Sequence, residues 1–147
     1  FNTMSGPEDQ LLQFRPDEPE RLAAPYYNFS SAAGIKYTVD VSRIPGDRVS
    51  IQSLSDGTSF NEMTTYSVAV NSYRGNGGGG HLTTGAGILK EELANRITWS
   101  TDRDLRFYLM EYLQRQDTLY PRIRQNWTCI PVHFTGPASL FDRKILD

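Results

Sequence analysis

The chain has 147 residues, of which 38% are hydrophobic, and its formal net charge at pH 7 is −2. These values are typical of one globular domain large enough to bury a core, and the mixed charges leave no basic patch for a nucleic-acid polymer. No window approaches the roughly 18 consecutive apolar residues that a membrane-spanning helix needs, so no membrane span is expected.

The first part of the chain is predicted to contain an irregular segment followed by a β-hairpin. Residues 1–25 hold four prolines and a run of acidic residues, which disfavour a helix and indicate a long surface connection. Alternating apolar residues then predict a strand that begins after Gly34. These residues are Ile35, Tyr37, Val39 and Val41. Turn residues at 44–47 and a second strand from Arg48 complete the hairpin.

One strand and two helices are predicted in the next part of the chain. Apolar residues alternate over 65–70, which predicts a third strand that is central and buried. Helical spacing of apolar residues over 88–97 predicts an amphipathic helix of about three turns. Thr101 and Asp104 resemble a capping box that opens a second helix, which ends before Pro121. The buried stripe of this helix is expected from Leu105, Leu109, Tyr112 and Leu113.

The last segment, residues 127–134, is predicted to be a closing strand at the edge of the sheet, because Pro131 interrupts it. Cys129 lies within this apolar segment and is interpreted as a small core residue. Because strands precede helices without βαβ alternation, we predict an α+β fold. Mixed or antiparallel sheet strands are followed by two amphipathic helices, in layers.

A run of glycines from Gly77 to Gly80 follows the predicted third strand and marks a candidate site. Four glycines in a row are costly to order, so a folded domain that keeps them usually needs a positive φ or a close approach to a ligand. The run formally matches a dinucleotide-binding glycine motif, but no βαβ unit surrounds it. A nucleoside-triphosphate loop would end in Gly-Lys-Ser/Thr, whereas here His81 and Leu82 follow.

Neither catalytic nor metal-binding residues are expected in this chain. His81 and His133 are far apart in the sequence, and neither has a second ligand at a metal-binding spacing. The serines lack the surroundings of a nucleophile. An acid–base role for His81, in an independent small enzyme, stays open as an alternative to a supporting role in its loop.

Two aromatic residues stand out because each borders a stretch of small residues. Phe29 precedes the segment 30–34, and Tyr73 precedes the glycine run. Two rings beside open backbone can hold a flat ligand between them, and stacking one base on a ring contributes roughly 1–3 kcal/mol. The other interpretation is that both rings are packing residues of the core or its rim.

At these residues the chain resembles the C-terminal domain of the 5′-nucleotidase family, which includes UDP-sugar hydrolases and 2′,3′-cyclic-nucleotide phosphodiesterases. The matching stretches are residues 29–40, 45–49 and 66–80, in the order and at the spacing of the family. The resemblance implies that this domain binds a nucleoside or nucleotide, with the base stacked between two rings at the positions of Phe29 and Tyr73. The glycine loop of the family matches Asn76, Gly77, Gly78, Gly79 and Gly80.

Gly79 stands where many 5′-nucleotidases have an aspartate that grips the ribose hydroxyls, which indicates another subgroup of the family. The resemblance also implies two divalent metal ions in an N-terminal metallophosphoesterase domain that this sequence does not contain. We therefore expect residues 1–147 to be the C-terminal portion of a larger hydrolase, with an irregular connection at 1–25 and a nucleotide-binding core at 26–147. Alone, this chain is expected to be inactive.

The hydrolase hypothesis has an alternative of a different class, a non-catalytic ligand-binding or interaction module that reuses the fold. Metal-ligand motifs upstream in the parent gene would separate the two. The preference for 5′-, 3′- or cyclic phosphates and the identity of the base stay open, as does the oligomeric state. The resemblance implies an exported or periplasmic protein.

Overall fold

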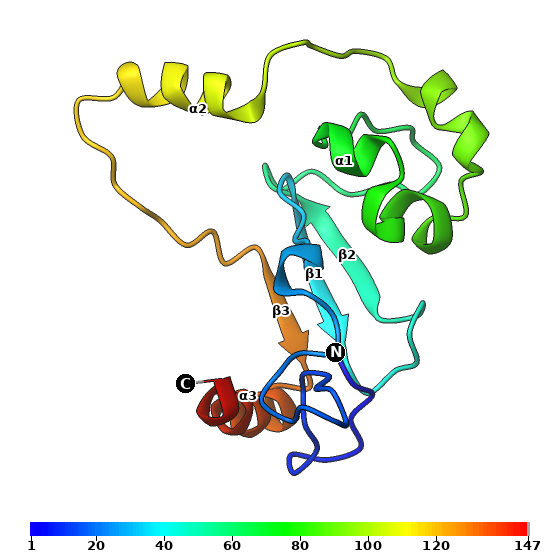
Figure 1. Ribbon diagram of the computed structural model, residues 1–147, viewed down its shortest axis with the longest axis vertical. Helices are drawn as coiled ribbons and strands as arrows, with labels where there is room; N and C mark the ends of the chain where they lie inside the picture. Colours follow the sequence, from blue (N-terminus) through cyan, green and yellow to red (C-terminus); the bar gives the residue numbers. More distant parts are fainter. Residues whose placement is uncertain (147) are drawn as a thin grey trace. The chain divides into compact units, whose positions relative to one another are not determined.

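The computed structural model describes residues 1–146, which divide into two compact units (Figure 1). The sheet unit consists of residues 1–64 together with the residues from Arg124 onward, and the glycine-loop unit consists of residues 65–123. The expectation of a single domain over residues 1–147 stays a prediction, because two compact units can belong to one domain.

The sheet unit is built on three strands, one short 3₁₀ turn and one long helix. In chain order these are η1 (Tyr26–Asn28), β1 (Ile35–Asp40), β2 (Val49–Leu54), β3 (Trp127–Ile130) and α3 (Val132–Leu146). The strand order is β2-β1-β3, with β1 antiparallel to β2 and parallel to β3. The predicted hairpin is confirmed, and the predicted closing strand does lie at an edge. The central strand is β1, not residues 65–70.

The core of the sheet unit joins segments that are distant in the sequence. Met4, Leu11, Val41 and Ala138 form its buried cluster, and the N-terminal segment lies beside α3 at one end of the sheet (Figure 1). The Asp142 carboxylate of α3 accepts a 2.7 Å hydrogen bond from the Leu12 amide. Residues 1–25 are irregular as expected, but the prediction of a surface connection is wrong, because Met4 and Leu11 are buried.

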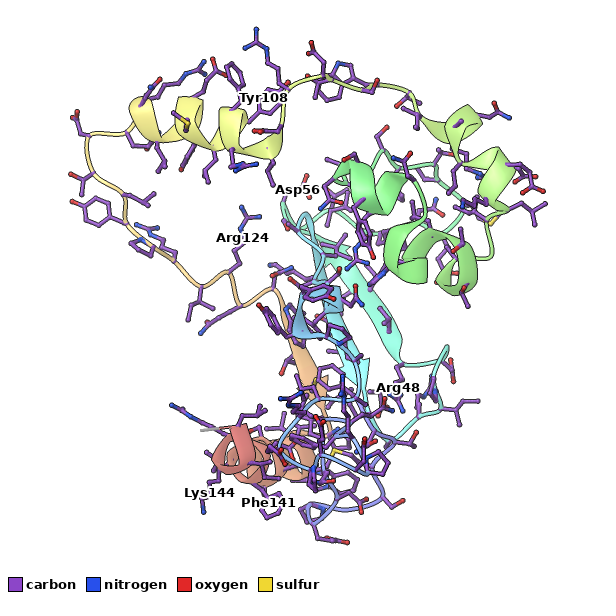
Figure 2. All side chains as sticks on the ribbon, in the orientation of Figure 1. Arg48, Asp56, Tyr108, Arg124, Phe141 and Lys144 are labelled. Carbon is purple, nitrogen blue, oxygen red and sulfur yellow. The ribbon has the colours of Figure 1, made fainter. Side chains whose placement is uncertain are left out.

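The helix α3 is a second difference from the prediction, which extended the last strand to residue 134. The strand ends at Ile130, and the Pro131 carbonyl accepts hydrogen bonds from the Phe134 and Thr135 amides at the start of α3. Pro137 lies inside this helix, so intrinsic propensity disfavours it. The inner face of the helix is nevertheless packed into the unit, with Thr135, Ala138 and Asp142 buried, while Phe141 is on the exposed side of the helix (Figure 2).

The glycine-loop unit contains short helical turns and one longer helix. In chain order these are α1 (Ser72–Gly75), η2 (Gly78–Gly80), η3 (His81–Gly85), η4 (Lys90–Glu92), η5 (Ala94–Arg96) and α2 (Leu105–Gln114). The predicted strand over 65–70 is wrong, since these residues form no strand in the described structure and Val68 is 77% exposed. Alternation marks a face that a sheet could bury, but a strand also needs a hydrogen-bonding neighbour.

The predicted amphipathic helix over 88–97 is replaced by the two 3₁₀ turns η4 and η5. Leu89 and Ile97 have extended backbone, which ends the helical geometry on both sides, and the Leu93 amide bonds the Lys90 carbonyl three residues back. The buried side chain of this segment is Leu93, while Leu89 and Ile97 are exposed.

The predicted helix after Thr101 is present as α2, but its start and its buried face differ from expectation. Asp104 is itself the N-cap, with its carboxylate accepting a 3.0 Å hydrogen bond from the Phe107 amide. Thr101 instead bonds the Tyr108 hydroxyl at 2.8 Å, and Tyr108 is labelled in Figure 2. The expected buried stripe is exposed, at 72% for Leu105 and 54% for Leu109, and the helix ends at Gln114.

With three strands of mixed direction and separate helices, the α+β class is confirmed. Among the helices of residues 1–146, none has the length and apolar character needed to cross a membrane.

Candidate functional site

Phe29 follows the turn η1 and lies at the surface of the sheet unit. Its amide bonds the Tyr26 carbonyl at 3.0 Å, and its backbone is extended. The residue is 57% exposed, yet its ring contacts two other rings. Its centroid lies 5.7 Å from that of Phe1, edge to face, and 5.9 Å from that of Trp127 at an interplanar angle of 44°. Phe29 is therefore a supported ring with open surface, which a stacking residue requires.

The small-residue segment after Phe29 is tied to the sheet by side chains that sequence reasoning missed. The Asn126 amide nitrogen donates to the carbonyls of Ala32 and Ile35, both at 2.8 Å. The Tyr37 hydroxyl accepts a 3.2 Å hydrogen bond from the Ala32 amide, and the Tyr37 ring stacks on Trp127 at 6.0 Å. Asn126 lies 94 positions beyond Ala32, so no local sequence signal connects them.

Tyr73 lies in the short helix α1 of the glycine-loop unit. Asn71 caps this helix through a 2.9 Å hydrogen bond from the Arg74 amide to its side-chain oxygen. Tyr73 is 55% exposed, and the Arg74 guanidinium carbon lies 5.4 Å from the centroid of its ring. Like Phe29, this ring is held on one side and open on another.

The glycine loop has the close contacts that a lack of side chains permits. A Cβ atom at Gly78 would lie 2.5 Å from the Tyr73 carbonyl oxygen and 2.6 Å from its ring. Gly77 has a φ of 87°, and a Cβ there would lie 3.1 Å from Leu93. Gly79 has a φ of 71°, a conformation that apart from glycine only asparagine and aspartate adopt with any frequency. The loop therefore holds Tyr73 directly against its backbone.

Arg74 and His81 hold the two ends of this loop together. The Arg74 guanidinium donates to the Gly78 carbonyl at 3.2 Å and lies 2.9 Å from Nδ1 of His81. That Nδ1 also lies 3.1 Å from the Gly79 carbonyl oxygen. One tautomer accepts from Arg74 and the other donates to Gly79, so His81 bonds the loop in either form. This arrangement supports the interpretation of His81 as a loop residue.

An open depression of about 670 Å³ lies beside the glycine loop. Its lining includes backbone of the loop, threonine side chains and one lysine; these are Asn76, Gly77, Gly78, Thr83, Thr84 and Lys90, with Gly87, Ile88 and Leu89 completing it. Backbone groups, hydroxyls and an ammonium group offer polar partners, while Ile88 and Leu89 add apolar surface. The expected loop residues Asn76, Gly77 and Gly78 therefore border open space.

Metal binding and thiol chemistry have no support in this part of the protein. Over residues 1–146, no three His, Cys, Asp or Glu side chains come together in a way that could hold a metal ion. Burial raises the pKa of the Cys129 thiol, so that little reactive thiolate is present at neutral pH. Cys129 packs against the core cluster of the sheet unit.

The structure brings together Tyr73 and the glycine loop from Asn76 to Gly80, and it places Phe29 in the sheet unit. The pairing of Phe29 with Tyr73 around one ligand stays a prediction. Ligand-binding roles for these residues and for the loop also stay predictions.

Comparisons with known proteins agree with the pattern of these residues. The family model described as "5'-nucleotidase, C-terminal domain" matches residues 9–85, just over half of the chain. The trifunctional nucleotide phosphoesterase protein YfkN of Bacillus subtilis (strain 168) is 31% identical over 133 residues. That match covers 82% of this chain but only 8% of YfkN, so the chain spans a small part of this curated relative. No solved structure matches the chain significantly.

Proposed function

This chain belongs to the 5′-nucleotidase C-terminal domain family, and from that membership we propose that it is the nucleoside- or nucleotide-binding part of a metal-dependent nucleotide phosphohydrolase. The observation that carries the proposal is the close approach of Gly78 to the Tyr73 ring, because Gly78 also lines the open depression. A half-exposed ring next to polar backbone suits a flat base that carries a polar sugar.

Phe29 supplies the second ring in this proposal. It is also half-exposed, its ring contacts the rings of Phe1 and Trp127, and it precedes a turn of small residues. The family match at residues 9–85 includes both Phe29 and Tyr73. We propose that the two rings stack on opposite faces of the base.

The sugar and phosphate are recognised differently from the aspartate-containing members of the family. Gly79 offers no carboxylate to the ribose hydroxyls, which fits a subgroup of the family other than the aspartate-containing 5′-nucleotidases, while the preference among 5′-, 3′- and cyclic phosphates stays open. YfkN is described as a trifunctional nucleotide phosphoesterase, which supports a nucleotide phosphoester as the substrate class.

Two divalent metal ions and an N-terminal metallophosphoesterase domain complete the proposed hydrolase. The described residues of this chain do not fit a metal site, so the ligands would come from that other domain. The 147-residue chain alone should release no phosphate from AMP or 2′,3′-cyclic AMP with Mn²⁺ or Co²⁺, relative to buffer. Metal-dependent turnover that is lost in a His81→Ala variant would contradict this.

The proposal is tested with ring substitutions in the intact protein. Phe29→Ala and Tyr73→Ala should each weaken nucleoside binding by roughly 1–3 kcal/mol, about 10-fold to 100-fold in affinity, because each removes one stacking face. Tyr73→Phe should be nearly neutral, since it keeps the ring. Affinity by calorimetry and thermal stability are measured on the same variants. Stably folded alanine variants with undiminished affinity would disprove the stacking.

A further inference from the structure

The contacts around Phe29 assign a role to two residues from the far end of the sheet unit. We propose that Asn126 and Trp127 are positioning residues for Phe29: Asn126 fixes the turn that follows Phe29, and Trp127 supports the ring. The expected effect on ligand affinity rests on the proposed function. The contacts themselves do not, because they lie within the sheet unit.

Asn126 holds the turn through both hydrogens of one amide group. Its side-chain nitrogen donates at 2.8 Å to the carbonyl of Ala32 and at 2.8 Å to that of Ile35. The backbone of Asn126 is itself fixed, because its carbonyl accepts a 3.0 Å hydrogen bond from the Tyr37 amide. The turn is therefore tied to the start of β1 and to the residue before β3 at once.

Trp127 connects the Phe29 ring to the buried part of the sheet. Its ring stacks on Tyr37 with an interplanar angle of 13° and a centroid separation of 6.0 Å. Tyr37 is buried and opposes Trp127 in the parallel β1–β3 register. The Phe29 centroid lies 5.9 Å from that of Trp127, which is too close for a base to enter between the two rings. A ligand would have to stack on the part of the Phe29 ring that Trp127 leaves exposed.

These contacts order Phe29 before a ligand arrives. An exposed aromatic ring that is free to rotate loses that freedom on binding, and a pre-ordered ring does not. Asn126 and Trp127 would thus raise affinity without touching the ligand. Asn126→Asp is a sharp probe, because the carboxylate has nearly the same shape but cannot donate to either carbonyl.

The first experiment compares Asn126→Asp with Asn95→Asp in the intact protein. Asn95 is exposed in the glycine-loop unit, so its variant introduces the same charge away from the turn. Asn126→Asp should weaken adenosine binding roughly tenfold, which is the loss expected when one base–ring stacking contact is removed. It should leave kcat nearly unchanged. Combined with Phe29→Ala, it should cause no further loss of affinity, because Asn126 acts through Phe29. Additive losses in the double variant would overturn the proposal.

A second readout does not depend on nucleoside binding. Hydrogen exchange of the Ala32 amide, which bonds the Tyr37 hydroxyl, should accelerate in Asn126→Asp, while exchange of the Val41 amide, bonded to the Ile130 carbonyl, should not. Unchanged Ala32 exchange overturns the proposal. If Ala32 exchange accelerates but the protein binds no adenosine, Asn126 does position the turn and the proposed function is wrong. Failure of the positioning role and failure of the proposed function therefore give different results.

A third measurement keeps Asn126 intact, in case its variant does not fold. The chain has two tryptophans, and Trp99 is exposed, so Trp99→Phe leaves Trp127 as the fluorescent reporter. Adenosine should change the Trp127 emission, because a base on Phe29 lies one ring away, and Phe29→Ala should abolish the change. Binding that leaves the emission unaltered would contradict the support of Phe29 by Trp127.

Discussion

The sheet unit and the glycine-loop unit are stabilised by contacts of different range along the chain. In the sheet unit, Met4, Val41 and Ala138 meet in one buried cluster, and the Leu12 amide bonds Asp142, 130 positions away. In the glycine-loop unit, Leu93 is the one buried side chain among the described residues, and Arg74 bonds Gly78 and His81 within seven positions. Substitutions in the sheet unit should therefore change stability, whereas those in the glycine loop should change the shape of the candidate site.

The largest expected effect tests whether the N-terminal segment belongs to the core. Met4 is 1% exposed, whereas Met63 is 93% exposed. Met4→Ala should lower the free energy of unfolding by about 2–5 kcal/mol, because it leaves a cavity, while Met63→Ala should be near neutral. Urea unfolding of the two variants measures this difference. Equal stability of both would mean that the segment is only a surface connection.

A smaller effect is expected in the glycine loop, where function should suffer more than overall stability. The Cβ of Gly78→Ala would meet the Tyr73 ring and carbonyl, so both the ring and the backbone must shift, at a cost of about 1–3 kcal/mol. Gly75→Ala is the matched control, because its Cβ would meet only Val70 at 3.8 Å. Nucleoside affinity should fall in the first variant and persist in the second. Equal affinities would show that the Tyr73–Gly78 contact has no part in binding.

An effect of about 1 kcal/mol is expected at the start of α2. It tests whether α2 is stabilised by contacts between residues that are close in the sequence. Asp104→Ala removes the cap of the Phe107 amide and should destabilise this helix by that amount. Exchange of the Phe107 amide should accelerate, with little change in the urea midpoint of the sheet unit. Asp102→Ala is the control. A larger effect from Thr101→Ala than from Asp104→Ala would restore Thr101 as the cap.

The smallest effect concerns a local bond inside the sheet unit. A 2.6 Å hydrogen bond from the Ser42 hydroxyl holds the pKa of Asp40 below its ordinary value. A lowered pKa contributes stability above the unfolded-state pKa and loses it as pH falls through the folded-state pKa. Ser42→Ala should raise the pKa of Asp40 in an NMR titration and slightly lower stability at pH 7, but not in strong acid. Ser67→Ala should do neither; an unmoved Asp40 titration in Ser42→Ala would reject the assignment.

Local patterns predicted the parts of the molecule that depend on local interactions. The hairpin follows from alternation in β1 and turn residues at 44–47, and a helix after Thr101 is present, although its cap is Asp104 and it ends at Gln114, well before Pro121. The same alternation failed at 65–70, because a strand requires a neighbour that the segment itself does not specify. The helix α3 was missed because Pro137 disfavours a helix locally, whereas the burial of Thr135, Ala138 and Asp142 depends on segments that are distant in the sequence.

The candidate site shows the same division. The glycine run and its preceding aromatic residue are visible in the sequence, and the contact of Tyr73 with Gly78 spans only five positions. The support of Phe29 depends on Asn126 and Trp127, which the parallel pairing of β3 with β1 brings near. No sequence pattern near Phe29 predicts that pairing. The sequence alone therefore indicated the Phe29 ring but not the support from Asn126 and Trp127.

The position of β3 in the chain has a consequence for biosynthesis. The edge of β1 that β3 covers is complete only when residues 127–130 have left the ribosome, long after β2 ends at Leu54. At about 5–20 residues per second, this delay is roughly 4 to 15 s. During that time the nascent hairpin exposes the unpaired backbone groups along the free edge of β1. Such an open edge can pair with strands of other chains. The hairpin is therefore the segment on which we expect a chaperone to act first.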